Sequence, residues 1–198
     1  MVQLWIVLRD MAPHEATRTG DDLAVCGNCP KRPSVERNGA LPCYVRAFQG
    51  PRSVWQASRG QTADLDAAVR AINQSGRALR LGAYGDPAAL PFEVTYALAR
   101  AAAHIGFTGY THQWRQQSAQ ALKSLLMASA DSPADRDLAH AMGWRTFRSI
   151  DRRQAFADLA PDEIFCPSSQ GVQCSDCGLC DGVRGDFDKR KSIAIFEH

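Results

Sequence analysis

Residues 78–114, ALRLGAYGDPAALPFEVTYALARAAAHIGFTGYTHQW, contain a complete strand–helix–strand unit. The apolar run 78–84 stops at a Gly-Asp-Pro sequence, which is typical of a strand followed by a turn. In 91–106 the apolar residues recur at helical spacing, and a glycine ends the pattern. Aromatic and β-branched residues predict a second strand at 107–114. A helix between two strands predicts a parallel pair joined by a right-handed crossover.

The same alternation extends in both directions along the chain. The apolar start, residues 1–10, predicts a first strand and lacks the features of a signal peptide. Further strands are predicted at 125–129, 144–150, 163–167 and 192–198, and helices at 63–74, 118–125, 133–142 and 152–160. This order predicts a single α/β domain over residues 1–198, built as a small or partial βα barrel of the TIM type. An open, doubly wound sheet is the alternative.

Composition excludes several classes of protein. The chain has 198 residues, of which 45% are hydrophobic and 22% charged, as in ordinary globular proteins. The net charge of +2 and the absence of a long basic run give no support for nucleic-acid binding. No apolar stretch approaches the ~18 residues of a membrane-spanning helix. Phosphate-binding glycine loops and the Gly-x-Ser-x-Gly motif of serine hydrolases are absent. We therefore expect a cytoplasmic protein with another chemistry.

Seven cysteines are the most informative residues of the chain. Without an export signal, an odd number of cysteines favours metal binding over disulfides. Ligands of parallel α/β proteins collect beyond the carboxyl ends of the strands. The cysteines follow two predicted strands: Cys26, Cys29 and Cys43 follow the first, and Cys166, Cys174, Cys177 and Cys180 follow strand 163–167. We expect all seven at the carboxyl-end face of the sheet.

The spacing of the last three cysteines favours an iron–sulfur cluster over zinc. Cys174, Cys177 and Cys180 form C-x2-C-x2-C, the core of the bacterial ferredoxin spacing, in which each thiolate reaches a different iron. Structural zinc more often takes separate C-x2-C pairs. We expect a [4Fe–4S] cluster whose fourth ligand is Cys166.

The other three cysteines leave several alternatives open. Cys26, Cys29 and Cys43 could hold a second cluster with one open iron, or share a single cluster with the C-terminal cysteines. They could also bind zinc together with a histidine. The available histidines are His14, His104, His112, His140 and His198.

Four other residues are candidates for lining the approach to such a centre. Asp86 follows one predicted strand, His112 and Trp114 end the next, and Arg148 lies in strand 144–150. Asp86, His112 and Arg148 are the catalytic candidates, as an acid, an imidazole near the metal and an anion-binding group. The alternatives are a turn aspartate, a histidine that hydrogen-bonds a loop, and a surface salt bridge.

Several of these stretches resemble known families. CGNCPKR, PCYVR, YGDPAALP, GYTHQW, CPSS and CSDCGLCDG together resemble a group of uncharacterised proteins encoded largely by bacteriophages and prophages. The resemblance implies a location in the cytoplasm of a bacterial host. A weaker resemblance, to radical SAM barrels, implies a partial barrel with a three-cysteine [4Fe–4S] cluster. The C-x3-C-x2-C motif of those enzymes is absent, so this resemblance implies the fold without the radical chemistry.

Two functional hypotheses follow. The first is an iron–sulfur protein with one or two clusters, acting as a redox module or enzyme on a small-molecule substrate or redox partner. The second is a zinc-stabilised binding protein that contacts a host factor or nucleic acid and catalyses nothing.

Overall fold

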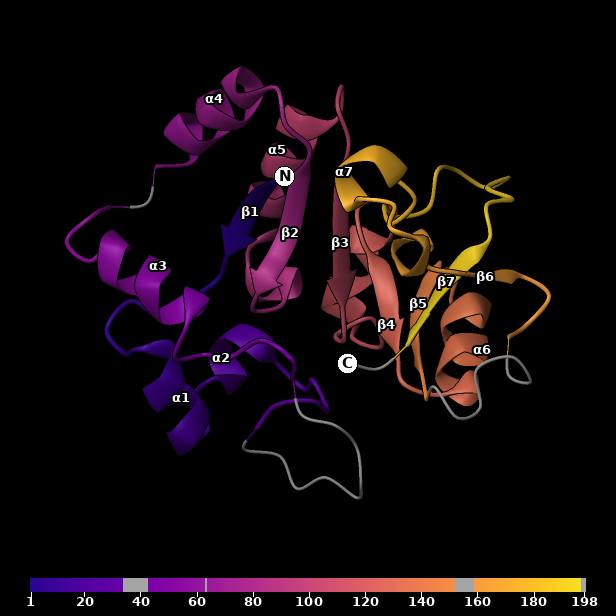
Figure 1. The fold of residues 1–198 in the computed structure, drawn as a ribbon, viewed down its shortest axis with the longest axis horizontal. Coiled ribbons are helices and arrows are strands. Elements are labelled where there is room, and N and C mark those ends of the chain that lie inside the picture. The colour runs from indigo at the N-terminus through magenta and orange to yellow at the C-terminus, as the bar shows by residue number, and fades with distance from the viewer. Residues whose placement is uncertain (34–42, 63, 152–158, 197–198) are drawn as a thin grey trace.

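The computed structural model describes residues 1–33, 43–62, 64–151 and 159–196 (Figure 1). It is an α/β structure with one sheet of seven parallel strands flanked by helices. In chain order the elements are β1 (Val2–Trp5), α1 (Pro13–Thr19), α2 (Leu23–Cys26), α3 (Gly50–Ser58), α4 (Leu65–Ser75), β2 (Leu79–Tyr84), η1 (Pro87–Ala89), α5 (Phe92–Ala102), β3 (Phe107–Thr111), η2 (Gln117–Ser124), β4 (Met127–Ala130), α6 (Pro133–Ala141), β5 (Thr146–Ile150), β6 (Glu163–Phe165), η3 (Pro167–Gln170), α7 (Cys174–Cys177) and β7 (Ser192–Phe196).

The strand order is β1-β2-β3-β4-β5-β7-β6. Each of the strands β2 to β5 lies next to the strand before it, always on the same side. In a doubly wound sheet, by contrast, later strands are added on both sides of the first strand. β7 then enters between β5 and β6 and pairs in parallel with both. β1 and β6 are the end strands, and no pairing between them occurs in the described part of the chain. The prediction of a parallel α/β fold is confirmed, and a closed barrel is not.

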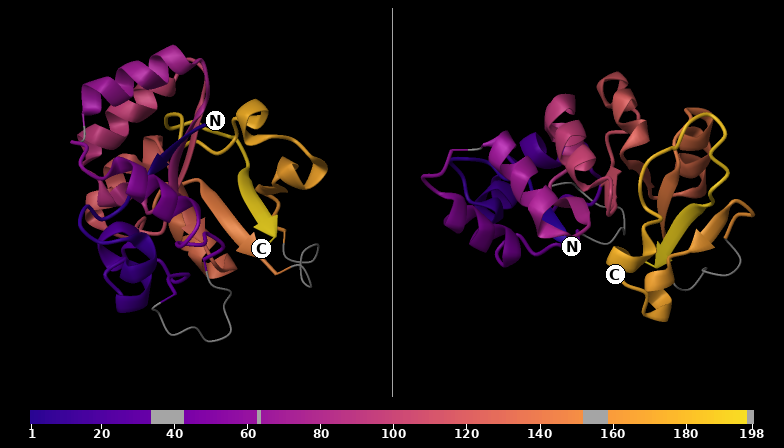
Figure 2. Two further views of the ribbon diagram at one scale, coloured as in Figure 1. Left: turned by 60° about the vertical axis from the view of Figure 1, so that its left-hand side comes forward. Right: turned by 90° about the horizontal axis from the view of Figure 1, so that it is seen from above.

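One face of the sheet packs against helices to form the main core. Leu79 and Leu81 of β2 are buried against Ile72 of α4 and Leu98 of α5. Full burial of each such side chain contributes about 1.5–3 kcal/mol. Because side chains alternate along a strand, Arg80, Gly82 and Tyr84 face the opposite side of β2. Both views of Figure 2 show the indigo and purple N-terminal elements and the yellow C-terminal strand on opposite sides of the molecule.

The local predictions agree with the structure except in details. The helix predicted at 118–125 is a 3₁₀ helix, η2, because short connections accommodate the tighter i→i+3 turns. Most of the helix predicted at 152–160 falls on residues 152–158, which lie outside the described residues, as does His198. No helix in the described ranges combines the length and apolarity needed to cross a bilayer.

Candidate functional site

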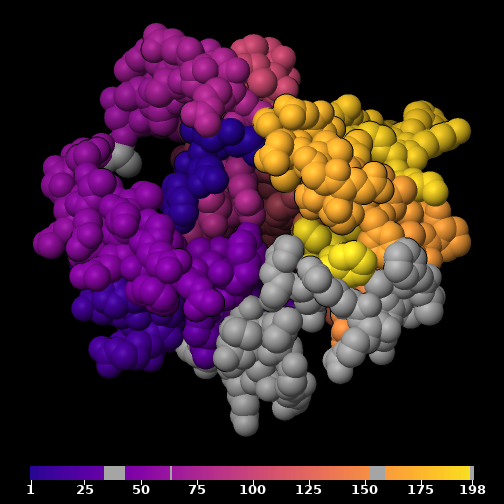
Figure 3. Space-filling model, viewed as in Figure 1, coloured from indigo at the N-terminus to yellow at the C-terminus, as the bar shows by residue number. Residues whose placement is uncertain are grey.

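A cavity of about 430 Å³ lies over the sheet face opposite the main core. Strands β2 and β3 form part of its wall through alternating side chains, among them Tyr84 and Tyr110. In the space-filling view, the central strands are visible between the purple N-terminal segment and the orange and yellow C-terminal segment (Figure 3). All seven cysteines line this cavity: Cys26, Cys29, Cys43, Cys166, Cys174, Cys177 and Cys180.

The N-terminal thiols, Cys26, Cys29 and Cys43, form one group. Cys26 is the last residue of α2. Burial raises the pKa of its thiol to about 12, with further contributions from the negative charges of Asp22, Cys29 and Cys43. Electrostatic coupling of this kind requires proximity, so these three sulfur atoms lie together. Thiols with raised pKa values become thiolates when a cation binds them.

Contacts with Gln113 hold the turn between the first two thiols. The Gln113 amide donates to the carbonyl of Cys26 at 3.1 Å, and its oxygen accepts from the backbone N–H of Asn28 at 3.1 Å. Gly27 between them has a φ of +55°, and a Cβ there would lie 2.4 Å from the Gln113 side chain. Only glycine therefore allows this approach, which fixes the position of Cys26 relative to Cys29.

His112 joins the N-terminal thiols from the end of β3. Its Nε2 lies 3.2 Å from Asp131, whose other oxygen is 3.4 Å from the Lys31 ammonium. Burial lowers the pKa of His112, but hydrogen bonds with Asp131 and Cys29 outweigh it and raise the pKa to about 10. The contact with Cys29 places an imidazole beside three thiols, which is a Cys₃His donor set.

The C-terminal thiols, Cys166, Cys174, Cys177 and Cys180, form the second group. Burial raises the pKa of Cys180 to about 12, and the charges of the other three thiols act in the same direction. The Tyr110 hydroxyl donates a hydrogen bond to Cys180 and opposes this shift. The expected fourth ligand, Cys166, is therefore near the triplet. Within the described residues, no three His, Cys, Asp or Glu side chains form a site shaped for a single metal ion.

The triplet does not lie at the carboxyl-end face, contrary to prediction. The backbone N–H of Gly109, in the middle of β3, donates to the carbonyl of Cys180 at 3.1 Å. Figure 1 shows α7 on the side opposite the arrowheads of β2 and β3. The reason is the length of the segment after Cys166, which lets the chain run back across the sheet. The carboxyl-end prediction holds for the N-terminal thiols, which contact His112 at the end of β3.

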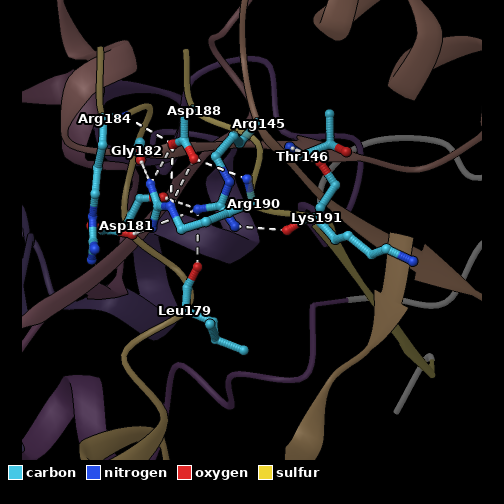
Figure 4. A network of polar contacts seen from close by, with 10 residues as sticks. Arg145, Thr146, Leu179, Asp181, Gly182, Arg184, Asp188, Arg190 and Lys191 are labelled. Carbon is cyan, nitrogen blue, oxygen red and sulfur yellow. Dashed lines mark hydrogen bonds and ion pairs between the residues drawn. The ribbon is translucent and has the colours of Figure 1, made fainter. Parts of the chain in front are cut away.

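A network around Arg145 fixes the segment that carries the triplet (Figure 4). The buried Arg145 guanidinium donates to the carbonyls of Leu179 at 3.0 Å, Asp181 at 2.8 Å and Lys191 at 2.8 Å. Arg190 forms an ion pair with Asp181 and hydrogen bonds to the carbonyl of Gly182 at 2.8 Å. These contacts involve no thiol, so protein groups alone hold the backbone beside Cys180.

Of the four other predicted residues, two line the cavity and two do not. Asp86 and His112 line it, and the Asp86 carboxylate accepts from the backbone N–H groups of Ala88 at 2.9 Å and His112 at 2.8 Å. Trp114 is fully buried in the main core, where its bulk belongs. Arg148 is 2% exposed and forms an ion pair with Glu163 at 2.6 Å, so it does not line the approach. Arg148 is corrected because it points to the face opposite its neighbours Phe147 and Ser149, which line the cavity. Trp114 is corrected because β3 ends at Thr111, so Trp114 lies in the turn that follows and packs into the core.

Several polar residues that line the cavity are not among the predicted site residues, namely Lys31, Arg80, Tyr84, Tyr110 and Asp131. The period-two alternation within 78–84 and 107–114 was a usable signal for three of them, because Arg80, Tyr84 and Tyr110 fall on the face without the leucines.

Comparison of this chain with protein-family models, with curated proteins and with solved structures finds no match in any of the three. The function proposed below is therefore inferred from the residues of the cavity.

Proposed function

We propose that the protein is an iron–sulfur protein that acts as a redox module or cluster-dependent enzyme on a small molecule bound between two metal centres. The observation that carries this proposal is the gathering of all seven cysteines around one cavity, in two groups. We regard the sheet as an incomplete βα barrel whose interior is this cavity. From the resemblance of the cysteine segments to phage proteins, we place its action in the cytoplasm of a bacterial host.

The C-terminal thiols are the proposed ligands of a [4Fe–4S] cluster. Cys180 is electrostatically coupled to each of the other three thiols, so the group supplies the four cysteines of the Cys₄ donor set, and the C-x2-C-x2-C spacing matches the ferredoxin core. The donor set therefore fits the group. When bound, such a cluster supplies one-electron chemistry, while Tyr110 would hold Cys180 through its hydroxyl.

The N-terminal thiols are the proposed ligands of a second centre. Three thiols leave one iron of a cluster without a cysteine, and His112 lies beside Cys29 as the next available donor. Lys31 and Asp131 hold His112 in place from the cavity wall. Proton transfer at this end of the cavity would use the imidazole of His112.

A zinc-stabilised binding protein is the second candidate, and one observation favours it. Cys26, Cys29, Cys43 and His112 are the residue types of the Cys₃His set that structural zinc accepts, and His112 contacts Cys29. In that case the protein would contact a host factor or nucleic acid without catalysis.

Anaerobic purification tests the two candidates directly. An iron–sulfur protein is brown, absorbs broadly near ~400 nm and contains iron and acid-labile sulfide in similar amounts. Substitution Cys177→Ser should remove most of the absorbance assigned to the C-terminal thiols, because one iron loses its ligand. Substitution Ser175→Ala in the same helix is the matched control and should leave the spectrum unchanged.

Two results would contradict the proposal. A colourless protein with stoichiometric zinc and no sulfide would support the binding protein instead. Full retention of the chromophore in Cys177→Ser would exclude the assigned ligands.

A further inference from the structure

Two hydrogen-bond donors in the cavity have no acceptor in the described part of the chain. The Tyr84 hydroxyl belongs to a side chain that is only 6% exposed, and no partner accepts its proton. The Nε of Arg80 is also buried without a partner. Both residues line the cavity from the same face of β2. A buried donor without an acceptor costs about 1–3 kcal/mol, so each favours a ligand that accepts a hydrogen bond.

Arg80 also introduces a positive charge that no carboxylate neutralises within the described residues. Its Nη2 donates to the Tyr44 hydroxyl at 2.5 Å, which leaves the charge uncompensated. The other cations of the cavity, Lys31 and His112, are already paired with Asp131. Arg80 is therefore the cavity cation that is available to an anion.

The Tyr84 hydroxyl is a donor near the N-terminal thiols. Tyr84 belongs to a buried cluster with Val25, against which Cys26 packs, and a phenol is protonated at neutral pH. The phenol therefore keeps its proton and donates. Positions 80 and 84 are at most about 13 Å apart along a strand, so one small molecule can reach both side chains.

The same cavity has an apolar part of its wall, to which β3 and β5 contribute. The rings of Tyr110 and Phe147 lie against each other with centroids 4.2 Å apart, and Leu179 and Val45 add aliphatic surface. A volume of about 430 Å³ is within the range of small-molecule sites. A ligand without an apolar part would leave this surface in contact with water.

We propose that the cavity binds a small organic anion, with its acid group on Arg80, its apolar body against Tyr110 and Phe147, and a second acceptor atom on Tyr84. The acid group is a carboxylate or a phosphate ester, since both accept hydrogen bonds from a guanidinium. Any reaction of the bound anion rests on the proposed function, because the part of the ligand at Tyr84 would lie beside the N-terminal thiols. Anion binding itself depends on Arg80, which is not a proposed metal ligand.

Calorimetric titration of the anaerobically purified protein tests the inference. The probes are benzoate, phenyl phosphate, acetate, inorganic phosphate and the uncharged benzamide. Benzoate or phenyl phosphate should bind more tightly than the other three, and the tighter of the two identifies the acid group. Arg80→Gln should weaken that binding about tenfold or more, through loss of a charge-assisted hydrogen bond. Tyr84→Phe should weaken binding of an aromatic acid with a para acceptor, 4-nitrobenzoate, by about threefold or more.

The matched control is Arg77→Gln, an exposed arginine three residues before Arg80, which should leave all affinities unchanged. A melting curve of each variant checks that it folds. Equal binding of benzoate, phenyl phosphate and benzamide would overturn the inference, as would unchanged affinity in Arg80→Gln. If acetate bound as tightly as benzoate, the proposed contact of an apolar ligand body with Tyr110 and Phe147 would be wrong.

Iron and sulfide are measured on the same samples. A protein without iron and sulfide that still binds benzoate through Arg80 would end the proposed function and retain the anion site. A protein that contains iron and sulfide but binds none of the anions would retain the proposed function and end the anion site.

Discussion

At the scale of single residues, hydrogen bonds and packing with neighbouring groups orient the side chains of the cavity. Tyr110 is the clearest example, because its hydroxyl donates to the sulfur of Cys180 while its ring packs on Phe147. Asp86 accepts hydrogen bonds from the backbone of both the η1 turn and the end of β3, so it links two strand ends at the cavity rim. Such contacts determine how a bound metal or ligand is held.

Removal of the Tyr110 hydroxyl should change the redox potential of the [4Fe–4S] cluster that we propose at the C-terminal thiols. Hydrogen bonds to cluster sulfurs stabilise the reduced form, so Tyr110→Phe should lower the midpoint potential by on the order of 50 mV. A redox titration followed by electron paramagnetic resonance measures this shift. Tyr96→Phe, a half-exposed tyrosine on α5, is the control with the same chemical change. A potential that stays constant or rises in Tyr110→Phe would contradict the expected role.

At the scale of elements, both thiol groups depend on short helices and the turns after them. α2 ends at Cys26 and α7 spans Cys174–Cys177, and each is followed by a glycine with positive φ. Helices of four residues are unstable alone, so tertiary contacts must hold them. Gln113 does this for the turn after α2, and Arg145 does it for the segment after α7.

Substitution Gly27→Ala should disturb the N-terminal thiols selectively. The new Cβ would meet the Gln113 side chain at 2.4 Å, in addition to the cost of a positive φ, which is on the order of 1 kcal/mol or more. We expect loss of metal from the N-terminal thiols and retention by the C-terminal thiols, measured as metal per chain. Gly60→Ala is the control, because Gly60 has a φ of +77° and no atom within 4 Å of its Cβ. Equal metal contents in the two variants would show that the close approach to Gln113 is unimportant.

At the scale of the whole molecule, a buried ion pair connects β5 to β6 across β7. Arg148 and Glu163 have side chains that are 2% and 0% exposed, with donor–acceptor distances of 2.8 and 2.6 Å. The backbone N–H of Ala160 also donates to Glu163 at 3.1 Å. The pair therefore tethers the end strand β6 to β5, with β7 between them.

Substitution Glu163→Gln should destabilise the whole fold, because it removes the negative charge that pairs with the buried Arg148 guanidinium. A loss of about 3–5 kcal/mol in the free energy of unfolding at pH 7 is expected. Burial raises the pKa of Glu163, but the hydrogen bonds and charge of Arg148 and the Ala160 N–H outweigh it, so the net pKa is lowered. A carboxyl whose pKa is lowered in the folded state stabilises the protein above its unfolded pKa of about 4.3, and this stability is lost at lower pH.

The difference in unfolding free energy between wild type and Glu163→Gln should therefore shrink as the pH falls below about 4.3. Urea titrations across this range measure it, and any loss of metal in acid affects both proteins alike. Glu93→Gln, on the exposed side of α5, is the control and should match wild type throughout. A difference that is independent of pH would contradict the role of the charge.

The sequence by itself determined the order of parallel strands and helices and the identity of the candidate metal ligands. Both depend on local patterns, namely apolar periodicity and the spacing of cysteines, which the chain carries wherever it folds. Only the tertiary structure decided that both thiol groups line one cavity and that the triplet lies across β3. These features depend on contacts between distant residues, such as Gly109 with Cys180 and Gln113 with Cys26. Arg148 was misplaced for the same reason, since the face on which a strand residue lies is fixed by what packs against the sheet. Trp114 was misplaced because β3 ends three residues before it, and the turn that follows carries its ring into the core.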